Sequence, residues 1–138
     1  MARDGIHYAV RRALEKENWT ITNDPFYVES GGVSVEIDME AEKFIAAQKE
    51  NVKILVEVKP LKNRSLLYDF HSAIGQYIDY QGIINDEKLE QILYLAIPET
   101  VYIEMQLKPF YERRLMDNHI KLVVVDIQNE NIITWKSY

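Results

Sequence analysis

The triplet Glu57-Val58-Lys59, which closes the apolar run Ile54-Leu55-Val56, combines an acid and a base at a spacing that suits phosphoryl chemistry. Side chains alternate between the two faces of a strand, so Glu57 and Lys59 point to the same side. A carboxylate can bind a divalent cation, and a neighbouring lysine can stabilise a developing negative charge. The pattern predicts a site for metal-dependent phosphodiester hydrolysis, with a surface ion pair on a solvated strand as the alternative.

A second acid is expected in such a site, because Mg²⁺ prefers hard oxygen ligands and usually keeps one or two carboxylates together with waters. Asp38 ends an alternating stretch, whereas Glu42 lies closer to Glu57 in the sequence. Asp38 and Glu42 have even residue numbers, whereas Glu57 has an odd one. Antiparallel pairing of the two strands across an odd-centred turn can still place either acid opposite Glu57. A β-bulge near Met39-Glu40 would bring Asp38 into place. We favour Asp38, retain Glu42 as the alternative, and expect Mg²⁺ or Mn²⁺.

Gln76 and Tyr80 are four residues apart in a helical stretch and share one face of it. In a nuclease Gln76 would point toward the metal or the DNA backbone; otherwise the pair forms a polar edge beside buried residues. His7 and His71 lack HxxxH or HExxH spacing, and we interpret both as structural or surface residues. The candidate catalytic residues are therefore Asp38, Glu57, Lys59 and Gln76, and the candidate metal ligands are Asp38, Glu42 and Glu57.

The length of the chain suits a single domain over residues 1–138 with a core of its own. The chain is 47% hydrophobic, which argues against disorder, and it has no cysteine, which excludes disulfides and thiol chemistry. No apolar run approaches the roughly 18 residues that span a bilayer. The first residues form an amphipathic segment rather than a signal-peptide core. We expect a soluble cytoplasmic protein that does not contact a membrane.

The net charge of −6 argues against a general nucleic-acid binder, since phosphate contacts need clustered Lys and Arg. It does not exclude a nuclease, whose bound cations would offset metal-site carboxylates. A local basic rim is conceivable, and its candidate members are Arg11, Arg12, Lys16, Lys62, Arg64, Arg113 and Arg114.

Apolar periodicity predicts two long helices. The first covers about residues 4–17 with Asp4 as its N-cap, and the second follows Ser65 as its N-cap. A further helix over about 100–117 is interrupted or restarted at Pro109. The second helix is expected to bury a stripe that consists of Leu66, Leu67, Phe70, Ala73, Ile74, Tyr77 and Ile78.

Alternating and β-rich segments predict the strands. Their ranges are 19–21, 26–28, 33–38, 44–47, 53–59, 91–97, 122–125 and 132–135. The order of helices and strands favours an α/β layer architecture with a mixed β-sheet flanked by helices. An acid, then Glu-x-Lys on a strand, then Gln-x-x-x-Tyr on the next helix is the layout of restriction-endonuclease-like nucleases.

An ordered set of short stretches resembles the XisH family, the fdxN element excision controlling factors of cyanobacteria. The stretches are Trp19-Thr20-Ile21-Thr22, Asp24-Pro25, Gly31-Gly32-Val33, Ile37-Asp38, Ala41-Glu42-Lys43, Ile45-Ala46-Ala47, Val56-Glu57-Val58-Lys59, Phe70-His71-Ser72-Ala73-Ile74-Gly75-Gln76 and Leu93-Tyr94-Leu95-Ala96-Ile97-Pro98. The resemblance implies a single-domain restriction-endonuclease-like fold. It also implies a part in the programmed excision of a DNA element during heterocyst differentiation, beside a site-specific recombinase and a companion factor called XisI.

One departure from the family pattern concerns Ser34, where members often carry an acid after the Gly-Gly-Val turn. If that acid is a ligand in the family, this copy would be weakened or inactive; if Asp38 or Glu42 is the ligand, Ser34 is harmless. Three hypotheses follow: a metal-dependent nuclease acting on DNA, a non-catalytic regulatory subunit that binds an XisI-type protein or a recombinase, and a defence-type pair whose companion restrains a nuclease.

Overall fold

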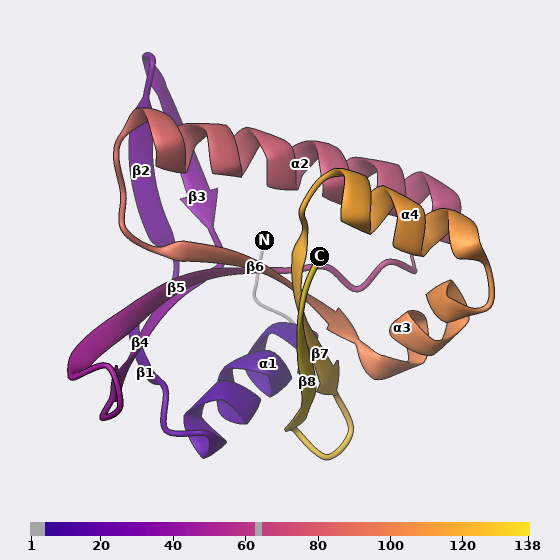
Figure 1. The fold of residues 1–138 in the computed structure, drawn as a ribbon, viewed down its shortest axis with the longest axis horizontal. Coiled ribbons are helices and arrows are strands. Elements are labelled where there is room, and N and C mark those ends of the chain that lie inside the picture. The colour runs from indigo at the N-terminus through magenta and orange to yellow at the C-terminus, as the bar shows by residue number, and fades with distance from the viewer. Residues whose placement is uncertain (1–4, 63–64) are drawn as a thin grey trace.

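The computed structural model describes residues 5–62 and 65–138, which form a mixed β-sheet with helices on both faces (Figure 1). The chain order of its elements is α1 (Gly5–Lys16), β1 (Thr20–Asn23), β2 (Phe26–Ser30), β3 (Val33–Ile37), β4 (Met39–Ile45), β5 (Glu50–Val58), α2 (Leu66–Asp86), β6 (Ile92–Pro98), α3 (Glu99–Gln106), α4 (Pro109–Asp117), β7 (Lys121–Asp126) and β8 (Asn131–Ser137). The predicted α/β architecture is confirmed.

The main sheet has the strand order β1-β4-β5-β6-β7-β8. The central strands β5, β6 and β7 run parallel, and the pairs β1–β4, β4–β5 and β7–β8 are antiparallel. Residues 54–58 of β5 are buried without interruption, because a central strand covered on both faces cannot keep one side polar. The apolar run before Glu57 therefore marks a strand in the middle of the molecule.

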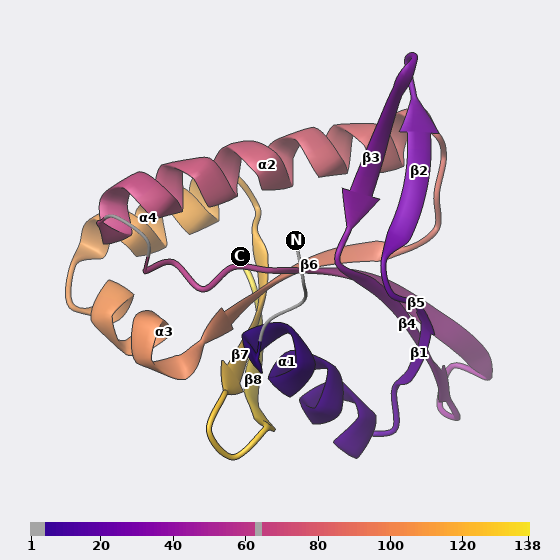
Figure 2. The same ribbon diagram turned by 180° about the vertical axis from the view of Figure 1, so that it is seen from behind.

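Helices cover the two faces of the sheet unequally, as the opposite views in Figures 1 and 2 show. On one face α1 inserts Val10, Ala13 and Leu14 against β4 and β5. On the other face α2, α3 and α4 pack over β5, β6 and β7 through a larger apolar cluster. The site residues at the ends of β4 and β5 consequently lie between α1 and α2.

A separate hairpin, β2–β3, stands outside the main sheet beside the C-terminal half of α2 (Figure 1). Its turn uses Gly31 and Gly32, which both have positive φ, a conformation that glycine adopts without a steric penalty. Ser30 donates a hydrogen bond to Glu87 just past the end of α2. The hairpin leads directly from the β1 segment to Asp38.

Several local predictions are confirmed. Ser65 is the N-cap of α2, its hydroxyl accepting a bond from the N–H of Tyr68, and a new helix starts at Pro109. Asp4, the expected cap of α1, and Arg64, an expected member of the basic rim, lie outside the described residues. No helix of the described ranges has both the length and the apolar character that crossing a bilayer requires.

Other local predictions are wrong. The β4–β5 register runs without a shift from Met39, so Asp38 reaches Glu57 without the expected bulge in β4. The irregularity beside Glu40 is in the neighbouring strand β1, between Ile21 and Asn23. The strand expected at 44–47 is the end of β4, which begins at Met39. Leu67 and Ile78 are 45% and 48% exposed, because the docked face of α2 is narrower than its apolar stripe.

Candidate active site

The pairing of β4 with β5 places Asp38 beside Glu57. Met39 pairs with Val56, so one step further along this antiparallel register brings Asp38 opposite Glu57. The N–H of Asp38 donates to Glu57 Oε1 at 3.2 Å, and the N–H of Val58 donates to Asp38 Oδ2 at 2.8 Å. Two carboxylates that are remote in sequence are thus held together by each other's backbone.

Lys59 completes the strand-borne part of the site. Its Nζ lies 3.4 Å from Glu57 Oε2, and its N–H donates to the carbonyl of Ala96 at 2.9 Å. Pro60 follows, and a proline has no N–H with which to continue the ladder. Glu57 and Lys59 therefore project from the last residues of β5, where the strand leaves the sheet.

The environment of Glu57 disfavours its negative charge. The residue is 8% exposed. Burial, followed by the charge of Asp38, raises the pKa of Glu57 to about 7, although Lys59 and the N–H of Asp38 oppose the shift. The Asp38 side chain is 21% exposed, so a buried carboxylate lies beside a partly buried one. With one ammonium group nearby the pair has an excess of negative charge, which a bound cation would relieve.

Helix α2 contributes Gln76 and Tyr80 to the same region. Gln76 Nε2 donates to the Tyr80 hydroxyl at 2.8 Å, and that hydroxyl donates to the carbonyl of Glu36 at 3.2 Å. Burial first, and then the charges of Glu57 and Asp38, raise the pKa of Tyr80, which keeps its proton. The hydrogen bonds fix the orientation of the Gln76 amide.

The amide oxygen of Gln76 has no hydrogen-bond partner. Gln76 Oε1 is buried and accepts no hydrogen bond. Gln76, Tyr80 and Glu36 also line an open groove of about 730 Å³ between β3 and α2. An unsatisfied buried acceptor costs free energy, so a site that supplies a donor or a cation to it is the natural explanation.

The donor set fits a magnesium-type ion. Asp38 and Glu57 offer carboxylate oxygens, and Gln76 offers an unpartnered amide oxygen, all of them hard ligands of the kind that Mg²⁺ prefers. Within residues 5–62 and 65–138 no three His, Cys, Asp or Glu side chains gather as a ligand cluster. If a Mg²⁺ ion binds here, waters would complete its coordination, since this ion usually keeps several of them.

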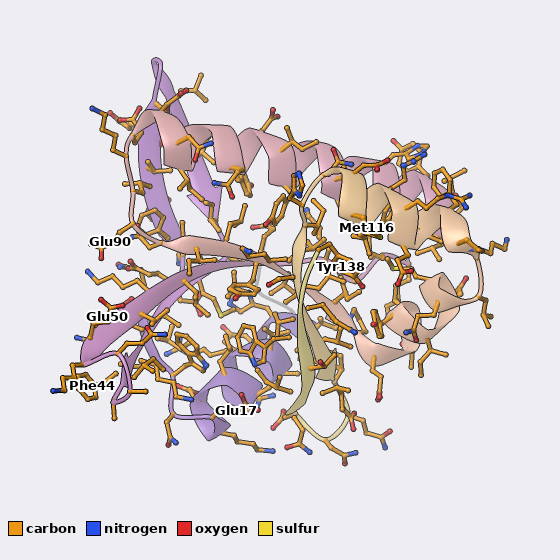
Figure 3. The ribbon with its side chains drawn as sticks, in the orientation of Figure 1. Glu17, Phe44, Glu50, Glu90, Met116 and Tyr138 are labelled. Carbon is orange, nitrogen blue, oxygen red and sulfur yellow. The ribbon has the colours of Figure 1, made fainter. Side chains whose placement is uncertain are left out.

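Glu42, the alternative acid, lies elsewhere. Glu42 pairs with Lys53 on β5. Along its own strand Glu42 is four residues from Asp38, which at the usual rise of a strand is a separation of about 13 Å. Glu42 lines a surface pocket with Thr20 and Phe44, and Figure 3 labels Phe44 and Glu50 at the far end of the β4–β5 hairpin. The structure does not bring Glu42 together with Asp38 and Glu57.

A buried histidine lies beside the site, at a position that the sequence analysis left open as structural or surface. His7 is 4% exposed; its Nε2 lies 2.9 and 3.0 Å from the two carboxylate oxygens of Asp24, and its Nδ1 lies 4.0 Å from Asp38 Oδ1. Arg11 donates to Asp24 at 2.8 Å. The helical spacing of His7 with Val10 and Leu14 is the signal that could have placed it on the buried face of α1.

A buried acid on β4 was missed. Glu40 is 8% exposed and accepts hydrogen bonds from Thr22, Asn23 and Gln91. Burial tends to raise its pKa, but these bonds outweigh that effect and the pKa of Glu40 is lowered. Because three donors satisfy this carboxylate, it ties β1, β4 and β6 together as a structural group.

Comparison with known proteins places these features in a wider group. The sequence profile of the XisH protein family matches residues 1–133. The crystal structure of an XisH family protein from Nostoc punctiforme is 37% identical with a TM-score of 0.86, and that of an fdxN element excision controlling factor protein from Anabaena variabilis is 36% identical with the same TM-score. Each alignment covers 96% of this chain and 98% of the other. No curated protein matches the chain.

Proposed function

Because the chain belongs to the XisH family, we propose that it is a controlling factor of DNA-element excision that hydrolyses phosphodiester bonds with Mg²⁺ or Mn²⁺. The observation that carries the enzymatic part is the convergence of Asp38, Glu57 and Lys59 at one end of β4 and β5. An acid before β4, Glu-x-Lys ending β5 and Gln-x-x-x-Tyr on α2 support a restriction-endonuclease-like fold. A structural ion pair between Glu57 and Lys59 alone would not explain why the Asp38 carboxylate lies beside Glu57.

Each side chain has a role that its position supports. Asp38 and Glu57 would hold the metal, with the amide oxygen of Gln76 as a further ligand or as an acceptor for a water. A bound Mg²⁺ supplies Lewis-acid polarisation and lowers the pKa of water in such sites. Lys59, 3.4 Å from Glu57, would stabilise the negative charge that develops on the phosphate oxygens. Tyr80 keeps Gln76 oriented through its hydrogen bond.

Cleavage assays test this proposal directly. Purified protein is incubated with supercoiled plasmid and with branched DNA, with and without Mg²⁺ or Mn²⁺, beside Glu57→Ala, Lys59→Ala and the control Glu42→Ala. We expect metal-dependent cleavage that both site variants lose by at least about 100-fold, in line with the loss of one charge-stabilising group. Glu42→Ala should cleave like the wild type, because Glu42 lies apart from the pair. Cleavage that persists in Glu57→Ala would reject the site.

A regulatory role is the second candidate, and the pairing of the basic side chains favours it. Arg11 binds Asp24, Arg12 binds Glu130 and Arg114 binds Asp117. These cations, three of the expected basic rim, are engaged with acids, while DNA binding depends on cations that meet phosphates. In this case the protein would act by binding an XisI-type companion or a site-specific recombinase.

Binding measurements separate the two candidates. A regulatory subunit predicts no cleavage by the wild type with any metal, no retardation of labelled DNA at low salt, and co-purification with the co-expressed companion. A nuclease predicts cleavage in the absence of any companion. Toxicity of the wild-type protein when it is expressed alone, relieved by Glu57→Ala or by co-expression of the companion, would indicate a nuclease that its companion restrains.

A further inference from the structure

We propose that the groove between β3 and α2 binds an extended, positively charged segment of a partner protein, which pairs with the outer edge of β3. Figures 1 and 2 show the β2–β3 hairpin projecting from the main sheet beside the C-terminal half of α2. The proposal concerns the outer part of this groove. It needs neither the metal site nor the cleavage reaction, so the two can be tested separately.

One edge of β3 carries main-chain groups that β2 does not use. The turn of the hairpin is two residues long, Gly31 and Gly32, so Ser30 and Val33 form the first hydrogen-bonded pair of the ladder. Hydrogen-bonded and non-bonded pairs alternate along antiparallel strands, and Ser34 belongs to the next pair, which is not bonded. The N–H and C=O of Ser34 therefore point away from β2.

A contact two residues further along shows which way this edge faces. The C=O of Glu36 lies on the same side of β3 as that of Ser34, and it accepts the hydroxyl of Tyr80 on α2 at 3.2 Å. The edge of β3 therefore faces α2 across the groove. Among residues 5–62 and 65–138, neither main-chain group of Ser34 has a hydrogen-bond partner. Such an edge is a template for an added strand.

The groove has the shape and lining for a short extended segment. Its volume is about 730 Å³, and four consecutive residues of β3, 33–36, line it; this is about 13 Å of strand at the usual rise. Val33, which is 59% exposed, and the half-buried Val35 and Ile83 give the groove an apolar wall. Because side chains alternate along a strand, aliphatic side chains on one face of the added segment would cover this wall.

The charge around the groove selects a positively charged occupant. The hairpin residues 26–37 and the helix residues 66–86 contain no lysine or arginine, although the whole chain has 16. Within the described residues no basic side chain lines the groove, whereas Asp79 does. Asp86, seven residues on and thus on the same face of α2, is exposed, and so is Glu29 on β2. These carboxylates would attract lysine and arginine side chains and repel the phosphates of a nucleic acid.

Nuclear magnetic resonance of the ¹⁵N-labelled full chain provides the test. The probe is a capped five-residue peptide of alternating lysine and valine, compared with a peptide of alternating glutamate and valine and with single-stranded oligothymidylate. We expect only the lysine peptide to shift amide signals, and the shifts to lie within residues 33–36 and 79–86. Pairing along β3 should also slow hydrogen exchange of the Ser34 amide by about tenfold or more, which adsorption to carboxylates alone would not do.

Matched variants separate the groove from the overall charge of the protein. Asp79→Lys should weaken binding of the lysine peptide by at least about fivefold, because an attraction at the groove becomes a repulsion. Glu104→Lys makes the same change of charge at an exposed position of α3, and its affinity should stay within about twofold of the wild type. A lysine peptide with N-methylated main-chain amides should bind at least about threefold more weakly, since it cannot donate to the Ser34 carbonyl.

Several results would overturn the proposal. Equal losses in Asp79→Lys and Glu104→Lys would mean that the peptide responds only to net charge. Absence of shifts at millimolar lysine peptide, or shifts at the edge strands β1 or β8 instead, would mean that the edge of β3 is not a docking surface. If Asp79→Lys does not fold, the lysine and glutamate peptides on the wild type decide the question.

The same spectra identify a different occupant of the groove. Shifts of the β3 and α2 amides by oligothymidylate would assign the groove to nucleic acid. The same shifts on raising the protein concentration without any peptide would assign it to a second copy of this chain. Either result would overturn the role of a basic partner segment and leave the proposed metal site untouched, because that site is tested by cleavage.

Discussion

Glu57 is the carboxylate on which the proposed chemistry depends most. It accepts the N–H of Asp38, lies near the ammonium group of Lys59 and is almost completely buried. Its raised pKa follows from burial first and from the neighbouring charge of Asp38 second. In the proposed metal site such a group would exchange its proton for a cation, because the cation would relieve the repulsion between the two acids.

The pH dependence of stability tests this environment. In the unfolded chain Glu57 titrates near its ordinary pKa of 4.5, and in the folded protein its pKa is about 7. Between these values the unfolded chain has lost the proton that the native state retains, so the free energy of unfolding falls as pH rises through this window. Without metal, we expect wild type to lose on the order of a few kcal/mol relative to Glu57→Gln between about pH 5 and 8.

The measurement is urea denaturation of the wild type and of Glu57→Gln in the presence of a chelator, repeated at pH values across this range. The glutamine side chain cannot ionise, so titrating groups remote from Glu57 cancel in the difference between the two profiles, which reports Glu57 together with the charges it interacts with. Parallel profiles would mean that Glu57 ionises normally in the folded state and that the pair has no excess charge to relieve.

At the scale of elements, α2 is the part that brings an amide to a strand-borne site. It runs for 21 residues from its Ser65 cap across the sheet and reaches the β2–β3 hairpin near its end (Figure 1). The Tyr80 hydroxyl joins this helix to the hairpin at the carbonyl of Glu36. The same helix thus positions Gln76 and supports the groove beside it.

The cap of α2 predicts a measurable loss of stability. Ser65→Ala removes the acceptor for the N–H of Tyr68, and we expect a cost of about 1 kcal/mol. Ser72→Ala, on an exposed turn of the same helix, is the matched control; since alanine is the better helix former, it should cost nothing. Urea denaturation of both variants measures the difference, and equal stabilities would show that the cap contributes nothing.

At the scale of the whole molecule, Tyr77 connects three elements that are far apart in the sequence. It is 5% exposed, its hydroxyl donates to the carbonyl of Leu93 at 3.0 Å, and it accepts the N–H of Lys121 at 3.2 Å. These bonds join α2 to β6 and to the start of β7. The helix that carries Gln76 is therefore anchored to the parallel centre of the sheet.

Removal of that hydroxyl should loosen the anchor. Tyr77→Phe keeps the buried ring but leaves both backbone groups without this partner, and we expect a loss of about 1–3 kcal/mol. Tyr27→Phe, at a tyrosine that is 66% exposed on β2, should change stability by less than about 0.5 kcal/mol. Thermal and urea unfolding check both values; a neutral Tyr77→Phe would show that water replaces the hydroxyl at no cost.

Local sequence patterns determined much of this protein. The apolar run before Glu57 predicted a strand, Ser65 predicted a helix start, and Pro109 predicted the break between α3 and α4. Such signals depend on backbone preferences and on periodicity within one element, so a single sequence contains them. The ordered motifs indicated the XisH family for the same reason: they lie along the chain and need no contact between distant segments.

Only the tertiary structure decided which of these residues meet. The β4–β5 register brings Asp38 rather than Glu42 to Glu57, and the docking of α1 brings His7 between Asp24 and Asp38. Strand register and helix docking are set by burial summed over segments that are distant in the sequence. A one-residue slip would move every side chain of β4 to the opposite face, and nothing in the local pattern around Asp38 excludes that slip.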